Sequence, residues 1–549
     1  MMRDNFSQSG KESGGSSVMS MPVSGRSLGN PEGQKNGEEQ QDEAVPIEYM
    51  DDVGMIVRGL PSFVYDPPVE TVVFGWGVNE DGQLGLLETQ QDVHAPKVIE
   101  GMLGTRLRGR GYGRSPIVAG SRNTLAVTAR GNVYSWGWND RATLGHGHRD
   151  PVLKPKRIDG LKGIRVVQVA LGGWHALGLD IQGRCWAWGG NEYSQCALDP
   201  DIRDVTEPQQ CMPNLRVCQV DAGGMHSVAL TDNGQIWTWG EQWGDFSMTI
   251  NRNPRRIDES GDFVRVVCGA FHNIALKCSG EVYTWGINDY GQLGNGTTSY
   301  ETSPKKIVGG LEGVKVSDIA AGGWHSVAIT EDGELYVWGR GEYGRLGLGD
   351  DTASKLRPTL LKDLVGLRVI EVSCGGTHTV AVTDEGRLFI WGRGSFGRLG
   401  TGREKNYFRP IEVSLPGGPD RWWIVSAAAG GRHTLVLAVP DNGNLESTEP
   451  AWSNRKSHSM YNGFAPRLNR DVAETPESVK DSITPAADSY SESKWFSQDH
   501  LQINSDADDE RGEEDDEAVQ GRTSSEIEKE IDRPLSHMPQ GPTNVDNYL

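Results

Sequence analysis

The sequence predicts an all-β fold, a seven-bladed β-propeller, and three observations support that prediction. One block of alternating apolar and polar residues recurs along the chain, each copy holds about four short strands, and there are seven copies. Four-stranded antiparallel sheets that repeat around an axis form a propeller. Repetition at a period of this length indicates such an architecture more directly than total length does.

The clearest copy of the block spans residues 320–350, with the sequence AAGGWHSVAITEDGELYVWGRGEYGRLGLGD. Alternating residues flank an acidic turn at 331–333, which is the pattern of a β-hairpin. A Gly-Arg-Leu-Gly loop at 344–347 closes the copy. In this copy we predict strands at 314–320, His325–Thr330 and 334–338, and a weaker fourth strand near 358–361.

Spacing defines the repeat. In five copies a histidine is followed 13 residues later by a Trp-Gly pair, and in a sixth copy asparagine takes the place of histidine. These pairs are His175 and Trp188, His226 and Trp239, His272 and Trp285, His325 and Trp338, His378 and Trp391, and Asn123 and Trp136. From Trp76 onward, successive Trp-Gly pairs are 60, 52, 51, 46, 53 and 53 residues apart. The pattern indicates a constant hairpin joined by loops of different length.

The two ends of the repeat array are complementary. Trp76 has no Gly-Gly-His sequence before it, and His433 has no Trp-Gly pair after it. One unit is therefore divided between the ends, and joining its halves gives seven blades. We predict that residues 71–75 pair with residues 433–438 in one sheet. Closing the ring in this way removes the sheet edges that an open array would expose.

Charge and composition divide the chain into three parts. Residues 1–70 carry a net charge of −7 and residues 441–549 a net charge of −14, which leaves residues 71–440 close to neutral within the total of −21. Like-charge runs such as SDADDERGEEDDE at 505–517 cannot bury enough apolar surface to offset the entropy of ordering. We predict a propeller over 71–440 between two disordered acidic tails.

Targeting and redox features favour the cytosol or the nucleus. The first 30 residues hold no apolar core of signal-peptide length, and no run approaches the roughly 18 apolar residues of a transmembrane helix. The seven cysteines form no CxxC pair, which indicates a reducing compartment. We expect no association with membranes. Because the N-terminal tail is acidic where a basic arm would be needed, direct nucleic-acid binding is not expected either.

The repeated histidines and tryptophans are interpreted as structural residues. A residue that recurs once per blade cannot converge with its copies on one metal ion, and buried polar groups need hydrogen bonds. The Trp-Gly tryptophans fit the apolar core. These structural positions are His175, His226, His272, His325, His378, His433, Trp76, Trp136, Trp188, Trp239, Trp285, Trp338 and Trp391. We find no phosphate loop, nucleophile motif or paired carboxylates, so we expect no catalytic residues, metal or cofactor.

The residue before each repeat histidine varies between blades, and it is the candidate partner-binding position. One such residue per blade should place all seven on one face of the ring, and we expect the side chains of all of them except Thr377 to be at least partly open to solvent. Tryptophan, arginine and methionine are enriched at protein interfaces. The seven residues are Arg122, Trp174, Met225, Phe271, Trp324, Thr377 and Arg432. The alternative is that they pack only on neighbouring loops.

The chain resembles the regulator of chromosome condensation (RCC1) repeat family. The matching motif is GG-x-H-[ST]-x-A-[LIV]-T-x-x-G-x-[VL]-Y-x-WG with the loop G-[QR]-L-G, as at 291–294, 344–347 and 397–400. The resemblance covers residues 71–440 and implies a seven-bladed propeller. Details such as Trp-Gly-Gly-Asn-Glu-Tyr at 188–193 are most similar to plant members related to ultraviolet-B receptors. WD40 and kelch repeats fit less well in period or in His-to-Trp spacing.

The resemblance implies three functional hypotheses. The first is a non-enzymatic scaffold that binds a protein through the variable face. The second is a guanine nucleotide exchange factor for a small GTPase such as Ran. In the family's exchange factor, acidic residues directly before repeat histidines help to engage the GTPase, whereas none of the seven positions here is acidic. The third is an ultraviolet-B photoreceptor. Those receptors carry tryptophan two residues before the histidine, where this chain has only glycine, alanine or serine.

Overall fold

The structure is a computed structural model, and it describes residues 70–86, 91–108, 115–241, 252–258 and 260–441. The chain divides into two units, Met1–Met55 and Ile56–Leu549, and every described residue belongs to the second. The predicted disordered tails lie outside the described residues, apart from Glu70 and Asp441 at their inner ends.

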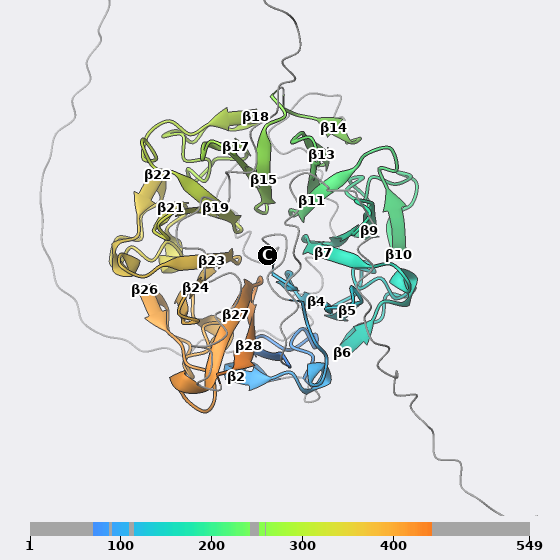
Figure 1. Cartoon of the computed structure of the whole chain (residues 1–549), viewed down its shortest axis with the longest axis horizontal. Coiled ribbons are helices and arrows are strands. Elements are labelled where there is room, and N and C mark those ends of the chain that lie inside the picture. The colour runs from blue at the N-terminus through green and yellow to red at the C-terminus, as the bar shows by residue number, and fades with distance from the viewer. Residues whose placement is uncertain (1–69, 87–90, 109–114, 242–251, 259, 442–549) are drawn as a thin grey trace, which may run out of the picture. The chain divides into compact units, whose positions relative to one another are not determined.

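The fold is a seven-bladed β-propeller, as the repeat predicts. Each blade is an antiparallel sheet of four strands, and the seven sheets surround a central axis (Figure 1). Six blades are continuous in sequence. From the axis outward, the first two of these blades are β3(Ile117–Ala119), β4(Asn123–Val127), β5(Val133–Gly137) and β6(Val152–Arg157), followed by β7(Val166–Leu171), β8(His175–Asp180), β9(Cys185–Gly190) and β10(Asp204–Cys211). The next two are β11(Val217–Ala222), β12(His226–Thr231), β13(Ile236–Gly240) and β14(Arg255–Arg256), followed by β15(Phe263–Cys268), β16(His272–Lys277), β17(Val282–Gly286) and β18(Glu301–Lys306). The last two are β19(Val316–Ala321), β20(His325–Thr330), β21(Leu335–Gly339) and β22(Lys355–Leu360), followed by β23(Val369–Cys374), β24(His378–Thr383), β25(Leu388–Gly392) and β26(Tyr407–Glu412).

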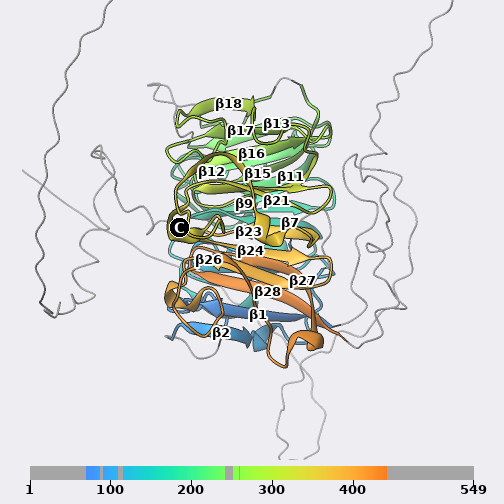
Figure 2. The same ribbon diagram turned by 90° about the vertical axis from the view of Figure 1, so that its left-hand side faces the viewer.

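The seventh blade joins the two ends of the array. Its strand order is β2(Val93–Val98), β1(Val72–Gly77), β28(His433–Pro440) and β27(Trp422–Ala429). In the edge-on view β1 and β28 lie side by side (Figure 2), and their register runs from Val72 opposite Ala438 to Gly77 opposite His433. The pairing predicted from the two staggered motif sets is therefore present. The closing blade therefore has four strands, like the other six.

The predicted strands of the clearest repeat lie close to the observed ones. His325–Thr330 is β20 as predicted, whereas β19 and β21 are displaced by one or two residues toward the C-terminus. The fourth strand, predicted near 358–361, is β22 at Lys355–Leu360. The outermost strand has one side on solvent and mixes lysine, arginine and proline with leucine, so it lacks a clear alternation. Short 3₁₀ turns make up the remaining regular structure, at Glu100–Met102, Asp159–Leu161, Glu342–Gly344, Lys362–Leu364, Ser395–Gly397 and Pro419–Arg421.

The glycine of each Trp-Gly pair is required by close approach of two strands. Gly339 has a φ of 98°, and a Cβ atom there would lie 2.6 Å from the backbone oxygen of Trp324. That contact is far inside the normal separation, and a positive φ is strained for residues with a side chain. The Trp-Gly motif thus ends the third strand of a blade and turns the chain toward the next loop.

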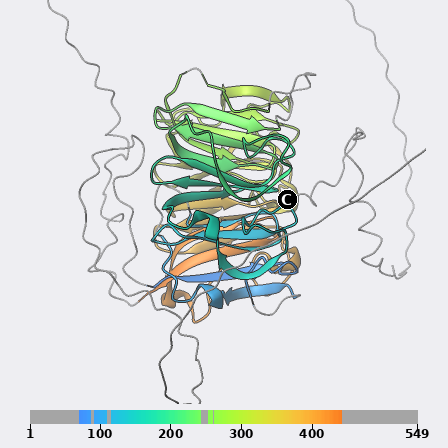
Figure 3. The ribbon, with the colours of Figure 1, turned by 90° about the vertical axis from the view of Figure 1, so that its right-hand side faces the viewer.

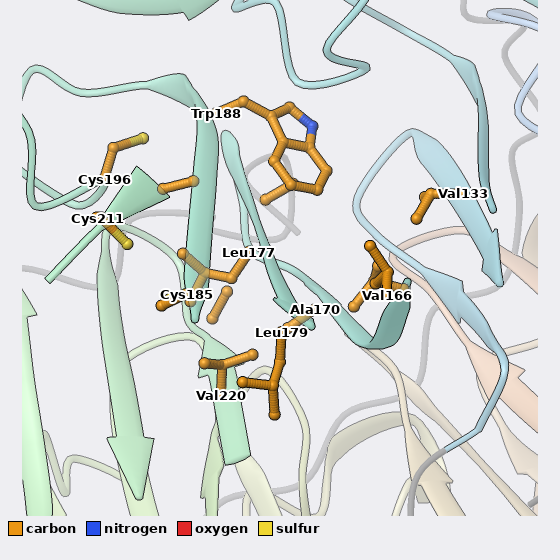
Figure 4. Packing of buried hydrophobic residues seen from close by; sticks show 14 of the residues in the cluster. Val133, Val166, Ala170, Leu177, Leu179, Cys185, Trp188, Cys196, Cys211 and Val220 are labelled. Atoms are coloured by element: carbon orange, nitrogen blue, oxygen red, sulfur yellow. The ribbon is translucent and has the colours of Figure 1, made fainter. Parts of the chain in front are cut away.

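The hydrophobic core lies between successive blades. The motif tryptophans are buried, at 0% exposure except Trp285 at 2%. Trp188 packs in a cluster with Val133, Val166 and Leu177, so its ring lies among residues of two adjacent blades (Figure 4). Edge-on views from both sides show the same stacking of sheets around the ring (Figures 2 and 3). Burial of a large aromatic ring in each interface accounts for one tryptophan per repeat.

Each repeat histidine forms a hydrogen bond between its own blade and the next one. His175 Nε2 lies 2.7 Å from Ser227 Oγ in the following blade, and Ser227 Oγ donates to the Gln195 carbonyl, 2.8 Å away in the first blade. Because the hydroxyl hydrogen is used in the second bond, the imidazole must donate Nε2–H to the hydroxyl oxygen. The carbonyl also accepts the Nε1–H of Trp239. We call this His–hydroxyl–carbonyl arrangement the relay.

The relay recurs around the ring with one variation and one gap. Equivalent histidine contacts join His272 to Ser326, His325 to Thr379, His378 to Thr434 and His433 to Thr124, and His226 reaches the carboxamide oxygen of Asn273. The gap lies between the blades of β4 and β8. There Asn123 replaces the histidine, and Ala176 stands where its hydroxyl partner would be. The histidine that would donate the hydrogen bond and the hydroxyl group that would accept it are thus both absent from this junction.

Restoring both members of this pair should rebuild the seventh relay. The acceptor carbonyl is already present, because Thr143 receives the Nε1–H of Trp188 at 2.8 Å. We expect Asn123→His combined with Ala176→Ser to be more stable than the sum of the single changes predicts, by about 1 kcal/mol for one buried hydrogen bond. Urea unfolding of the parent, both single variants and the double variant measures this coupling. If the change in the free energy of unfolding of the double variant equals the sum of the changes in the two single variants, the restored relay does not form.

Candidate functional site

The seven residues that precede the repeat histidines occupy equivalent positions at one end of the blades. The backbone carbonyl of each accepts a hydrogen bond of 2.8–3.0 Å from the residue that follows a Trp-Gly pair. These bonds join Val78 to Arg432, Trp138 to Arg122, Gly190 to Trp174, Glu241 to Met225, Ile287 to Phe271, Arg340 to Trp324 and Arg393 to Thr377. Because the loops after the Trp-Gly pairs start at the same end, these loops and the seven residues form one surface. We call it the arginine–aromatic face.

The prediction that side chains are open to solvent is wrong for two of the six residues that it covers, Trp324 and Met225. Trp324 is 6% exposed, Met225 is 8% exposed and Thr377 is 4% exposed. Arg122, Trp174, Phe271 and Arg432 are only partly buried.

Neighbouring loops account for two of the three buried residues. The ring of Trp324 lies 4.7 Å from that of Phe271 and 5.4 Å from that of Tyr290, measured between ring centroids. Thr377 Oγ1 accepts a 2.6 Å hydrogen bond from Arg398 Nη1. The alternative interpretation, packing on neighbouring loops, therefore holds for these two residues.

A second set of residues on this face was missed by the sequence reasoning. In four blades the residue five places after the motif tryptophan contacts the residue before the histidine of the next blade. Asp81 accepts two hydrogen bonds from Arg122, at 2.6 and 2.8 Å, and the Arg141 guanidinium lies 5.5 Å from the Trp174 ring. The other two contacts join Tyr290 to Trp324 and Phe396 to Arg432. The fixed offset from tryptophan would have identified these positions.

Guanidinium groups stack on aromatic rings at several points of the face, within a blade or between adjacent blades. Arg122 lies over Trp138 at 5.4 Å, and Arg252 over Tyr193 at 5.0 Å. Arg340 lies over Tyr290 at 4.6 Å. Contacts of this kind contribute about 0.5–1 kcal/mol each at exposed sites. They also hold long arginine side chains in fixed directions, which reduces the entropy lost when a partner binds.

Two adjacent blades carry a variant of the loop. At 338–347 and 391–400 the sequence is Trp-Gly-Arg-Gly-x-x-Gly-Arg-Leu-Gly, whereas the other described loops have asparagine at the fourth position or lack the arginines. The second arginines of the two loops, Arg345 and Arg398, are buried, at 0% and 2% exposure. Arg345 Nη1 donates to the Gly376 carbonyl at 3.3 Å, and Arg398 Nη1 donates to the Gly431 carbonyl at 3.2 Å. Both cations are thus fixed beneath the face.

The charges on the face are unevenly distributed. Glu80, Asp81, Asp140, Glu192 and Asp289 lie in the loops of four blades, whereas the variant loops carry four arginines and a single acidic residue. Burial raises the pKa of Asp81, which the Arg122 hydrogen bond opposes, and burial also raises the pKa of Asp289. The face therefore has an acidic side and a basic side.

The central channel is a separate feature of the ring. A cavity of about 230 Å³ is lined by the innermost strands and by the Gly-Gly pairs of the repeats. Its charged residues include Arg265 and Asp318, which form a 2.6 Å ion pair. Over the residues that the structure describes, no group of three His, Cys, Asp or Glu side chains could hold a metal ion. Within the same residues, no helix is long and apolar enough to cross a membrane.

The accessible side chains of the arginine–aromatic face suit the binding of a protein. The repeat histidines are buried in the relays, so they cannot reach a substrate on the face. Accessible rings, guanidinium groups and carboxylates on one rigid surface are what a protein interface uses. The rigid blades fix the positions of the loops, and the loops differ from blade to blade.

Comparison with known proteins agrees with the fold and the repeat. The RCC1-like domain profile matches residues 72–436. The chain is 34% identical over 355 residues to the ultraviolet-B receptor UVR8 of Arabidopsis thaliana, covering 62% of this chain and 78% of that protein. It is 35% identical over 371 residues to the human E3 ubiquitin-protein ligase HERC2, but that match spans 67% of this chain and only 6% of HERC2.

Solved structures show the same fold. Human WBSCR16 superimposes with a TM-score of 0.59 at 26% identity, covering 67% of this chain and 99% of that one. Prp20p of Saccharomyces cerevisiae superimposes with a TM-score of 0.62 at 23% identity, covering 71% and 96%. The profile match over most of the propeller and the identity to UVR8 agree with the repeat motif and the seven blades. The chain belongs to the RCC1-like domain family.

Proposed function

We propose that this protein is a non-enzymatic interaction scaffold that binds a protein partner through the arginine–aromatic face. The observation that supports this most strongly is the stacking of arginines on rings at five blade junctions of one face. Arginine, tryptophan and tyrosine dominate the binding energy of protein interfaces. We also propose that it acts in the cytosol or the nucleus, on the sequence argument from its cysteines.

We do not propose guanine nucleotide exchange or light sensing. Prp20p has been studied for its binding to Gsp1p and histones, but at 23% identity it shares only the fold with this chain. None of the seven residues before the histidines is acidic. Trp174 and Trp324 lie in blades that are not neighbours. The ring of Trp174 contacts Arg141, and the ring of Trp324 contacts Tyr290. No observation on this face favours either activity.

Substitutions on the accessible part of the face test the scaffold proposal. We expect Trp174→Ala combined with Arg432→Ala to weaken partner binding by more than tenfold, because loss of a central tryptophan or arginine commonly costs about 2 kcal/mol or more. The melting temperature should change little, since both side chains are partly exposed. Affinity capture with quantitative mass spectrometry, followed by titration of the recovered partner, measures the effect.

Matched variants make that test specific. Trp186 is also partly buried, lies in strand β9 and has Arg184 over its ring at 5.4 Å, so Trp186→Ala with Arg157→Ala is the control. The control should retain the partner. Trp324→Ala is not a binding test, because truncating a buried tryptophan costs about 3–5 kcal/mol of stability. If the folded face variant captures the same proteins as the parent, the partner docks elsewhere. Release of labelled GDP from a panel of small GTPases checks the exchange alternative separately.

A further inference from the structure

The basic side of the face is a distinct feature, which we call the arginine sector: Arg340, Arg345, Arg393, Arg398 and Arg432. These residues come from three adjacent blades. The two variant loops and Arg432 together hold five arginines and one carboxylate, Glu342, which pairs with Arg340. The loop at 76–85, in contrast, carries Glu80 and Asp81 and no basic residue. The sector is thus a concentrated positive charge within a nearly neutral propeller.

Aromatic rings separate a buried arginine from an outer one in two columns. The Tyr343 ring lies 5.7 Å from the Arg345 guanidinium and 4.5 Å from that of Arg393. The Phe396 ring lies 5.6 Å from the Arg398 guanidinium and 5.7 Å from that of Arg432. The rings keep the outer guanidinium groups near the face, and each buried cation adds its field behind them. Guanidinium groups held in this way suit bidentate binding of carboxylates.

Backbone strain and electrostatics support a binding role. Tyr343 and Phe396 have φ angles of 60° and 62°, a left-handed conformation that is unfavourable for bulky residues and concentrates at functional sites. The positive field reaches the repeat histidines beneath. Burial is the main cause that lowers the pKa of His325 and His378, and the charges of Arg345 and Arg398, respectively, lower it further.

The sequence itself contains an acidic segment that matches this charge. Residues 505–517 hold nine carboxylates and one arginine, a net charge of −8. The 63 residues between Asp441 and residue 505 can span up to roughly 200 Å, so chain length does not prevent contact. A segment tethered to its site reaches an effective concentration of about millimolar, which favours it over a free acidic ligand of equal affinity.

We propose that the acidic segment 505–517 binds the arginine sector of its own chain and competes there with an acidic segment of the protein partner. This inference rests on the proposed function, because the sector belongs to the arginine–aromatic face. Binding of the tail would leave only partners with a stronger acidic segment able to engage. Any change that removes charge from 505–517 would then open the site.

Binding of a labelled peptide SDADDERGEEDDE to the full-length protein, followed by fluorescence anisotropy, tests the proposal. The parent should bind the peptide at least tenfold more weakly than a full-length variant whose nine acidic residues at 505–517 are changed to their amides. Adding Arg340→Gln, Arg393→Gln and Arg432→Gln to that amide variant should weaken binding at least tenfold. The control changes Arg157→Gln, Arg387→Gln and Arg409→Gln lie outside the sector and should leave the affinity within twofold. A peptide with amides in place of its acids should not bind.

Each other outcome overturns the proposal in a recognisable way. Equal peptide affinity for the parent and the amide variant means that the tail does not cover the sector, while partner capture through the face can still succeed. No binding to the amide variant, or binding that survives the sector changes, means that the sector does not recognise acidic segments. If light scattering shows that the parent dimerises and the amide variant does not, the tail binds a second copy instead. Failure of the scaffold proposal would be seen separately, as partner capture that the Trp174 and Arg432 changes leave intact.

Discussion

Deletion of residues 1–78 should abolish folding of the whole propeller, whereas deletion of residues 1–70 should leave a protein that melts cooperatively. The longer deletion removes β1, which lies between β2 and β28 and pairs with β28 at six positions. It also removes Trp76, which is fully buried and donates its Nε1–H to the Arg398 carbonyl at 2.9 Å. Truncating such a tryptophan alone costs about 3–5 kcal/mol, and a domain is stable by only about 5–15 kcal/mol.

The comparison of the two deletions isolates ring closure. Only eight further residues distinguish them, and those residues contain the strand that joins the ends. Thermal unfolding followed by circular dichroism and tryptophan fluorescence measures both proteins against the parent. A 1–78 deletion that melts as cooperatively and at as high a temperature as the parent would show that closure through β1 does not hold the ring. Without β1, an exposed edge on β28 should also make the protein prone to aggregation.

The blade architecture could be predicted because it depends on local sequence. The 13-residue offset from histidine to tryptophan fixes a two-stranded register, seen in the pairing of His325 with Gly339. The stagger of the two motif sets located the closing blade, because each end of the array lacks the part of the unit that the other end supplies. Outer strands were predicted least well, since β22 has one solvent-facing edge and lacks alternation.

The binding face could be only partly predicted, because exposure depends on contacts between blades. Sequence placed Trp324 on the face but could not show that Phe271 and Tyr290 from the preceding blade enclose it. The same limit hid the gap in the relay. Asn123 and Ala176 each look like an ordinary substitution, and their relation emerges only when the two blades are adjacent.

Acid should unfold this protein cooperatively, with a midpoint between about pH 4 and 5.5. Burial lowers the pKa of His175, His272 and His433 to about 3, and it also lowers the pKa values of His226, His325 and His378. In the unfolded chain these six side chains take up protons near pH 6.5, but in the folded protein they stay neutral. The unfolded state therefore binds more protons below pH 6.5, so stability is full above that pH and falls as the pH drops toward 3.

The size of the effect and its control follow from the same linkage. Each histidine contributes up to about 1.4 kcal/mol per pH unit, so six can remove the stability of an ordinary domain within two units. Asp262 and Glu281 are ion-paired carboxylates whose pKa is lowered in the folded protein. Their contribution to stability is therefore lost at lower pH than that of the histidines. The pKa of Asp384 is raised, so this carboxylate takes up a proton more readily in the folded protein than in the unfolded chain. This partly offsets the loss of stability in acid.

A single relay histidine can be replaced by asparagine, the residue that the blade of β4 already has at the equivalent position, Asn123. His272→Asn should be less stable at pH 7.5 but should lose stability less steeply between pH 6 and 5, by about 1.4 kcal/mol per unit. Thr298→Asn, which changes an exposed residue without a titratable group, is the control and should keep the parent slope. Urea unfolding at several pH values gives the slopes. An unchanged slope in His272→Asn would mean that His272 is already protonated in the folded ring, contrary to the lowering of its pKa by burial.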